Sequence, residues 1–270
     1  MPGRSQPDAR EVTEMAPDRR AALTAGLLFM VATAASLLSA AVERPVLTGT
    51  GYLARIPENM DRVSAGGLLE LIAAGTSAGI AISLYPVLRK RSEGLALGAV
   101  VFRALEAVMY TVAAVITLSL PRLAQQYPRA AAAGGGFRGA GDALAGVRED
   151  AILAGVFAFT LGALMYYCVF YRSRLVPRWL SGWGIAAVFL LLTACLSALF
   201  RHAPVTSFTI LILPIAVQEM VLAVWLIVRG FRPSALGPGS PPRPAETWTS
   251  NTTDSCADSV AASTCAPTRL

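Results

Sequence analysis

Six long apolar segments, separated by shorter polar ones, dominate the pattern of hydrophobic and polar positions along the chain. Each segment has about 21 to 26 residues, and at 1.5 Å per residue a helix of that length crosses the roughly 30 Å hydrocarbon core of a bilayer. We therefore predict an all-α protein, a polytopic transmembrane helical bundle of six spans. The spans are predicted at residues 21–42, 64–88, 95–120, 151–171, 180–200 and 207–228.

The segments outside these spans are not expected to form regular secondary structure. Residues 1–20 and 233–270 are polar and Pro-containing without periodicity, so we expect disordered N- and C-terminal tails around a transmembrane domain at residues 21–232. In the connection at residues 121–150, the Ala and Gly run at 130–141 predicts a mobile loop. A cleaved signal peptide is the alternative interpretation of the first span, but its apolar region exceeds the usual length of about 7 to 15 residues.

The overall composition agrees with a lipid environment. Hydrophobic residues make up 54% of the chain and charged residues 15%, whereas an ordinary soluble domain carries about 25% charged residues. The net charge of +6 does not indicate nucleic-acid binding, because the arginines lie between apolar runs and form no stripe. The abundance of alanine and arginine, with a single lysine at Lys90, is typical of a GC-rich bacterial genome.

The distribution of basic residues predicts the orientation of the spans. Two short turns on the same side are crowded with cations, namely Arg89, Lys90 and Arg91 in one and Arg172, Arg174 and Arg178 in the other. Because short cytoplasmic loops carry such an excess, we place both termini in the cytoplasm of a bacterial plasma (inner) membrane. The predicted partners are the lipid bilayer and, at this cytoplasmic face, anionic lipid headgroups. An aromatic belt is expected at the same interface, formed by Tyr166, Tyr167, Tyr171, Trp179 and Trp183.

Four ionisable residues fall within the predicted spans, where each costs at least about 2.5 to 3.5 kcal/mol at the centre of a lone helix. We therefore expect an inward-facing polar cluster, composed of Glu70, Arg103, Glu106, Gln218 and Glu219. Arg103 and Glu106 are three residues apart, which places them on one helix face. Arg103 and Glu219 lie at a similar predicted depth, so we expect Arg103 to bridge Glu106 and Glu219. One arginine cannot neutralise three carboxylates, and we expect Glu70 or Glu106 to hold a proton.

Three further residues bear on helix packing. Pro214 lies inside the last span, where it frees the carbonyl of Ile210 and predicts a kink one turn before the Gln218–Glu219 pair. Gly75 and Gly79 form a GxxxG pattern, which predicts close packing of the second span. This pattern does not distinguish packing within the chain from dimerisation, and the oligomeric state stays open.

Two functional interpretations remain open. In the first, the protein is a small transporter or ion-coupled membrane protein, in which the cluster conducts a proton or cation or Arg103 binds an anionic substrate group. In the second, it is a non-catalytic structural or partner-binding membrane protein whose buried charges only lock the helices together. The sequence has no metal-binding motif, phosphate loop or catalytic triad pattern, so no metal or cofactor is predicted and an intramembrane enzyme is least favoured.

Several segments resemble a known family. They read ELIAAG and GIAISLYPVL at residues 70–88, EGLALGAVVFRALEAV at 93–108, YRSRLVPRWLSGWG at 171–184 and LPIAVQEMVLAVWLIVRGF at 213–231. In these segments the chain is similar to the bacterial membrane-protein family catalogued as domain of unknown function 4386. The Ala and Gly run at 130–141 and the C-terminal tail depart from the family pattern. The resemblance implies a multi-pass membrane protein without an established activity, and its charged motifs match Glu70, Arg103, Glu106, Gln218 and Glu219.

Overall fold

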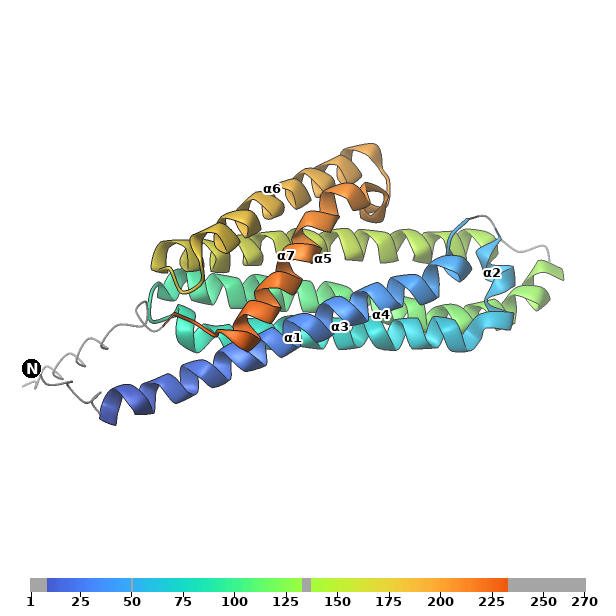
Figure 1. The fold of residues 1–270 in the computed structure, drawn as a ribbon. Coiled ribbons are helices and arrows are strands. Elements are labelled where there is room, and N and C mark those ends of the chain that lie inside the picture. Colours follow the sequence, from blue (N-terminus) through green and yellow to red (C-terminus); the bar gives the residue numbers. More distant parts are fainter. Residues whose placement is uncertain (1–8, 50, 133–136, 233–270) are drawn as a thin grey trace, which may run out of the picture. The chain divides into compact units, whose positions relative to one another are not determined.

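The computed structural model describes residues 9–49, 51–132 and 137–232, and within these ranges every regular element is a helix (Figure 1). The all-α prediction is therefore confirmed for the described residues. The α helices are α1 (Ala9–Leu47), α2 (Tyr52–Arg55), α3 (Met60–Leu88), α4 (Glu93–Ala132), α5 (Phe137–Ser173), α6 (Arg178–Arg201) and α7 (Thr209–Val228). Two short 3-10 helices, η1 (Pro57–Asn59) and η2 (Val205–Phe208), precede α3 and α7.

Six helical segments of the described chain are long and apolar enough to cross a membrane. They are Pro17–Leu47, Pro57–Leu88, Glu93–Gln126, Gly139–Ser173, Arg178–Arg201 and Val205–Val228. Each contains one of the six predicted spans, so the protein is a multi-pass membrane protein. The segment Glu93–Gln126 has 34 residues and extends about 50 Å, which exceeds the roughly 30 Å hydrocarbon core. Helix α4, like its partner α5, is therefore longer than the hydrocarbon core is thick.

Two segments that we expected without structure are helical. Helix α1 begins at Ala9, inside the predicted N-terminal tail, and the Ala and Gly run at 130–141 is entered by α4 from one side and α5 from the other. Alanine has the highest helix propensity, and each extension prolongs a helix that the transmembrane segment has already nucleated. The prediction of a mobile loop was therefore wrong at residues 130–132 and 137–141. Residues 1–8, 133–136 and the predicted tail at 233–270 lie outside the described residues.

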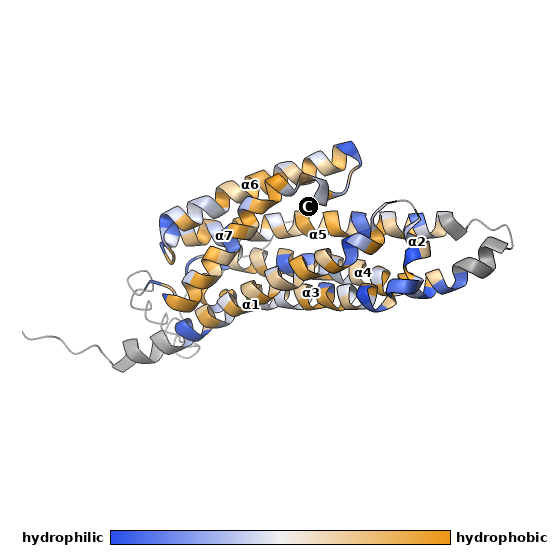
Figure 2. Ribbon diagram, turned by 45° about the vertical axis from the view of Figure 1, so that its right-hand side comes forward, coloured by the Kyte–Doolittle hydropathy of each residue, from blue (hydrophilic) through white to orange (hydrophobic). Residues whose placement is uncertain are grey.

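The start of α1 and the end of α7 meet at one end of the bundle. Arg19 donates hydrogen bonds to the carbonyl oxygens of Leu226 (3.1 Å) and Ile227 (2.7 Å), which end α7. The Asp18 carboxylate lies 3.1 Å from Nζ of Lys90, in the turn between α3 and α4. We call this the basic end, and we call the opposite end, where α2 lies, the α2 end. Hydrophilic residues are concentrated at the helix ends and apolar residues along the helix bodies (Figure 2).

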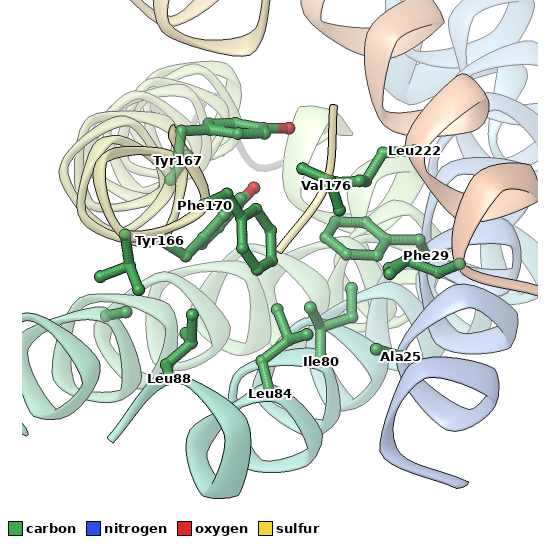
Figure 3. Close-up of a cluster of buried hydrophobic side chains, with 14 of the residues drawn as sticks. Ala25, Phe29, Ile80, Leu84, Leu88, Tyr166, Tyr167, Phe170, Val176 and Leu222 are labelled. Carbon is green, nitrogen blue, oxygen red and sulfur yellow. The ribbon is translucent and has the colours of Figure 1, made fainter. Parts of the chain in front are cut away.

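A large hydrophobic core joins all six long helices. Figure 3 shows part of it, in which aromatic side chains of α5 face the aliphatic side chains of α3. The Phe29 ring of α1 packs edge-on against Tyr166 with the centroids 6.3 Å apart. Helices α1 and α7 touch at Gly26, where an added Cβ would lie 2.9 Å from the Ala223 carbonyl oxygen. Only a glycine permits this close approach of α1 to α7.

A second, smaller hydrophobic cluster lies at the α2 end. It consists of Val46, Tyr52, Leu53, Ile56, Val63, Leu120 and Ala124, from α1, α2, α3, α4 and the segment between α2 and η1. The connection between the first two spans, which the sequence indicates as polar and rich in turns, is thus packed against α4. We call this group the cap cluster.

Of the two glycines in the GxxxG pattern, one lies close to a neighbouring helix. At Gly79 an added Cβ would lie 3.1 Å from the Leu28 side chain, so this glycine faces α1. At Gly75 an added Cβ would meet no described atom within 4 Å. Pro214 lies inside α7, which continues on both sides of it. The predicted kink stays a prediction.

Candidate functional site

Arg103 and Glu106 form a buried ion pair on one face of α4. The guanidinium Nη1 lies 3.1 Å from the Glu106 carboxylate, and the two residues are only 2% and 4% exposed. Their three-residue spacing brings both side chains to the same helix face, as predicted. The pair is shielded from solvent by the surrounding helices, which strengthens its electrostatic attraction and makes any unpaired charge costly.

The predicted residues of α7 meet two tyrosines of α5. Tyr166 donates a hydrogen bond to the Glu219 carboxylate (3.3 Å), and Tyr167 bonds to the side-chain oxygen of Gln218. The Gln218 amide in turn donates to the Leu180 carbonyl of α6 (3.2 Å). Consecutive residues of α5 thus reach consecutive residues of α7. Glu219 lies within three residues of the centre of the span Val205–Val228, about 4 Å along the helix axis.

Two tyrosines that we predicted for the aromatic belt lie in the core instead. Tyr166 and Tyr167 are buried in the core, whereas Tyr171 and Trp179 are exposed. Residues 166 and 167 lie one to two turns farther into the span than Tyr171, so only the latter reaches the end of α5. The hydrophobic pattern alone did not reveal that Tyr166 and Tyr167 bond to polar side chains of α7. We call Arg103, Glu106, Tyr166, Tyr167, Gln218 and Glu219 the midplane group.

Arg103 does not form the bridge that we predicted. Among the described residues its ion pair is with Glu106 alone, and its guanidinium lies over the Phe159 ring, 4.9 Å from the centroid. This contact is a cation–π interaction. Two buried polar atoms around the pair, Nε of Arg103 and Oγ of Ser77, have no hydrogen-bond partner in the described structure, whereas Nη1 of Arg103 and Oε2 of Glu106 contact each other in the ion pair. The midplane group therefore holds one guanidinium, two carboxylates and unused hydrogen-bonding capacity.

Glu70 lies apart from the midplane group and binds Arg148 of α5. The same Nη2 atom of Arg148 also lies 2.5 Å from the Glu43 carboxylate of α1. Nε of Arg148 donates to the Thr117 hydroxyl of α4 (2.7 Å), and this hydroxyl lies 3.0 Å from the Glu70 carboxylate. Glu149 binds Nη1 of Arg148 at 3.3 Å. We call these five residues the Arg148 group.

Sequence reasoning missed Arg148 and Glu43 because both lie just outside the predicted spans. Glu43 follows the first span directly, and Arg148 precedes the fourth span by three residues, so both were assigned to polar connections. A signal was present in helical spacing: Ser39 and Glu43 are four residues apart, and the Ser39 hydroxyl lies 3.1 Å from the Glu43 carboxylate. Continuing the spans by one helical turn would have placed both charges in the bundle.

The two charged groups lie at different levels of the bundle. Along α4 the distance from Glu106 to Thr117 is about 16 Å, at 1.5 Å per residue. The helix faces between them carry small buried side chains, Ala73 and Ala74 on α3 and Ala113 and Ala114 on α4. We call these four residues the alanine layer. The five residues predicted as one cluster are thus divided, with Glu70 on one side of this layer and the other four on the opposite side.

An open apolar groove of about 430 Å³ runs along α7. Its lining residues are Val217, Met220, Val221, Val224, Trp225, Val228 and Arg229. None of them belongs to the midplane group. Within the described residues, no set of three or more His, Cys, Asp or Glu side chains has the arrangement of a metal site.

Comparison with known proteins identifies the family of the chain. No curated protein and no solved structure matches the sequence. Residues 24–230 match the family described as Domain of unknown function (DUF4386), which covers all six membrane-spanning helices and both charged groups. The predicted resemblance is confirmed over most of the chain. The chain therefore belongs to the family described as Domain of unknown function (DUF4386).

Proposed function

We propose that the protein is a small ion-coupled membrane transporter, and that the midplane group holds the coupling ion. The observation that carries this proposal is the buried Arg103–Glu106 pair together with a second carboxylate, Glu219 near the middle of α7, which binds Tyr166 and lies within electrostatic range of the pair. A group with one guanidinium and two carboxylates needs a proton or a monovalent cation to become neutral, because a buried net charge is costly. A proton is the smallest ion that meets this need.

The hydrogen bonding of the midplane group favours an ion site over a static lock. A buried polar atom without a partner costs about 1 to 3 kcal/mol, and a group that serves only to hold helices together gains most when every atom is bonded. Among the described residues, Nε of Arg103 has no polar partner, and the Arg103–Glu106 contact is an ion pair without hydrogen-bond alignment. The Tyr166 hydroxyl suits a proton site, since it donates to an ionised Glu219 and accepts from a protonated one.

Proton flux in reconstituted liposomes tests the proposal. Wild-type protein is expected to dissipate an imposed pH gradient, recorded with an encapsulated pH-sensitive dye. Glu219→Gln keeps the shape of the side chain and removes the charge, and we expect it to reduce the flux about tenfold or more, as loss of an ionisable intramembrane residue implies. The matched control is Glu93→Gln, an exposed glutamate at the start of α4. A wild-type flux no greater than that of empty liposomes would contradict the proposal.

A structural or partner-binding role is the second candidate function. It is favoured by the near-complete burial of Arg103 and Glu106 and by the position of the groove along α7, away from both. In that case Arg103→Leu lowers the stability of the fold, and neither wild-type nor variant protein carries protons. The liposome experiment thus separates the two functions.

We further propose that the basic end faces the cytoplasm at the inner membrane of a bacterium and binds anionic lipid headgroups. Arg19, Lys90 and Arg229 lie at this end, and the exposed Trp179 lies near the start of α6. Short basic segments and aromatic residues are typical of the cytoplasmic interface. A membrane-impermeant maleimide applied to intact cells should therefore label Arg62→Cys and spare Arg91→Cys. The melting temperature should be higher in phosphatidylglycerol than in phosphatidylcholine.

A further inference from the structure

We propose that Arg148 is the centre of a charge lock that closes the α2 end of the bundle, and that releasing it opens a path to the midplane group. The purpose of the lock rests on the proposed transport function. Its geometry does not, because the contacts of Arg148 are independent of what the midplane group binds.

One guanidinium ties four helices together. Arg148 projects from α5 and binds Glu43 of α1, Glu70 of α3 and Thr117 of α4. The side chains of Arg148, Glu43 and Glu70 are 13%, 5% and 14% exposed. Bonds between a guanidinium and carboxylates are charge-assisted and directional, so they hold these helices in one arrangement. Glu43 and Glu70 share the same Nη2 atom, so a single displacement of Arg148 releases α1 and α3 together.

A glycine allows the lock to form between α1 and α3. The Ser39 hydroxyl of α1 lies 3.1 Å from the Glu43 carboxylate and 3.2 Å from the Gly66 carbonyl oxygen of α3. An added Cβ on Gly66 would overlap the Glu43 side chain. Glu43 therefore lies directly on the α3 backbone, which orients its second carboxylate oxygen toward Arg148.

Helices α6 and α7 take no part in the lock within the described residues. Helix α1 meets α7 near Gly26, toward the basic end, where the large hydrophobic core also lies. At the α2 end the cohesion of α1, α3, α4 and α5 comes from the Arg148 group and the small cap cluster. Because of this division, the helices can separate at the α2 end while they stay packed at the basic end. Hinge-like transitions that exchange one set of salt bridges for another work in this way.

The alanine layer determines which part of the bundle becomes accessible when the lock opens. Between the Arg148 group and the midplane group, α3 and α4 carry four buried alanines, at residues 73, 74, 113 and 114, besides the larger Ile116 and the partly buried Tyr110 of α4. Small side chains leave a passage as soon as the helices separate, whereas large ones would continue to fill it. Opening the lock therefore exposes Ser77, which lies beyond this layer and is 2% exposed in the locked structure.

Cysteine labelling tests the lock without any measurement of transport. The full-length protein, with its four native cysteines replaced by alanine, carries Ser77→Cys as the reporter in liposomes. A membrane-impermeant maleimide is applied to the α2 end. We expect Arg148→Met to increase the labelling rate about tenfold, since loss of the shared guanidinium shifts the population toward the open form. Arg62→Met, an exposed arginine of α3 at the same end, is the matched control and should leave the rate unchanged.

Glu43→Gln decides the outcome even if Arg148→Met does not fold. It preserves the size of the side chain and weakens one charge-assisted bond, so we expect a rate about threefold above that of the reporter alone. Gel filtration establishes that the variant is folded. A labelling rate equal to that of the reporter alone would overturn the lock. That result would leave the flux test of Glu219→Gln untouched, and a lack of flux would leave the labelling result standing.

Discussion

Glu70 of α3 and Arg148 of α5, which are 78 residues apart in the sequence, bind each other in the structure. Their pairing divides the buried charge of the bundle between two levels. At each level a single guanidinium faces more carboxylates than it neutralises, with Glu106 and Glu219 near Arg103, and Glu43, Glu70 and Glu149 around Arg148. The alanine layer lies between the two levels.

The coupling between Arg148 and Glu70 is measurable by a double-mutant cycle. Arg148→Met removes one partner of a buried pair and is expected to lower the free energy of unfolding by about 3 to 5 kcal/mol. In combination with Glu70→Gln the losses should fall short of their sum by about 1 to 3 kcal/mol, because both variants break the same bond. Denaturant titration of the protein in mixed micelles provides the values. Strict additivity, as expected for Arg148→Met with the distant Glu93→Gln, would show that the pair is not coupled.

Glycine-to-alanine substitutions should rank by the space around each glycine. Gly26→Ala brings a methyl group 2.9 Å from a backbone oxygen of α7 and should cost about 1 to 3 kcal/mol. Gly79→Ala meets only the flexible Leu28 side chain and should cost less. Gly75→Ala meets nothing among the described residues and should be neutral, or stabilising by up to about 1 kcal/mol through helix propensity. The same denaturant titration applies. A destabilising Gly75→Ala would instead indicate that this face of α3 binds a second copy.

Tyr167→Phe should destabilise the protein through Gln218. The amide of Gln218 is fully buried and loses its tyrosine partner, which leaves an unpaired buried oxygen at a cost of about 1 to 3 kcal/mol. Tyr171→Phe, on the same helix but 42% exposed, should change the melting temperature little. Equal melting temperatures for the two variants would argue against the Tyr167–Gln218 bond.

Arg19→Gln should loosen the last turn of α7. The guanidinium of Arg19 binds the carbonyl oxygen of Ile227 at the C-terminus of the helix and that of Leu226, which also accepts a hydrogen bond from the Gly230 N–H. We expect amide hydrogen exchange at residues 226–230 to become about tenfold faster, since the bonds of a charged group contribute about 1.5 to 3 kcal/mol. Arg20→Gln, at an exposed neighbouring position, serves as the control. Unchanged protection in Arg19→Gln would show that the end of α7 is stable without this cap.

Local spacing made part of the candidate site predictable. Arg103 and Glu106 pair because a three-residue separation puts them on one face of whatever helix they occupy. The predicted depth of a residue in the membrane was a weaker guide to its partner. Glu219 does lie near the middle of its span, but its carboxylate accepts a hydrogen bond from Tyr166 and does not bind Arg103. Tyr166 and Tyr167 were assigned to the interface because a tyrosine in an apolar run suits a membrane surface and a buried polar contact equally well.

The sequence by itself determined that six helices cross the membrane, because a backbone in lipid must satisfy its hydrogen bonds within the segment and an apolar run of this length leaves only the helix. It also determined which residues are costly enough in lipid to face inward. Arg103 and Glu106 pair through local spacing, but only the tertiary structure decided the partners of the other residues. A shift of one residue turns a side chain by about 100° around the helix, so the pairing of Glu70 with Arg148 depends on how four helices are rotated and how far they extend.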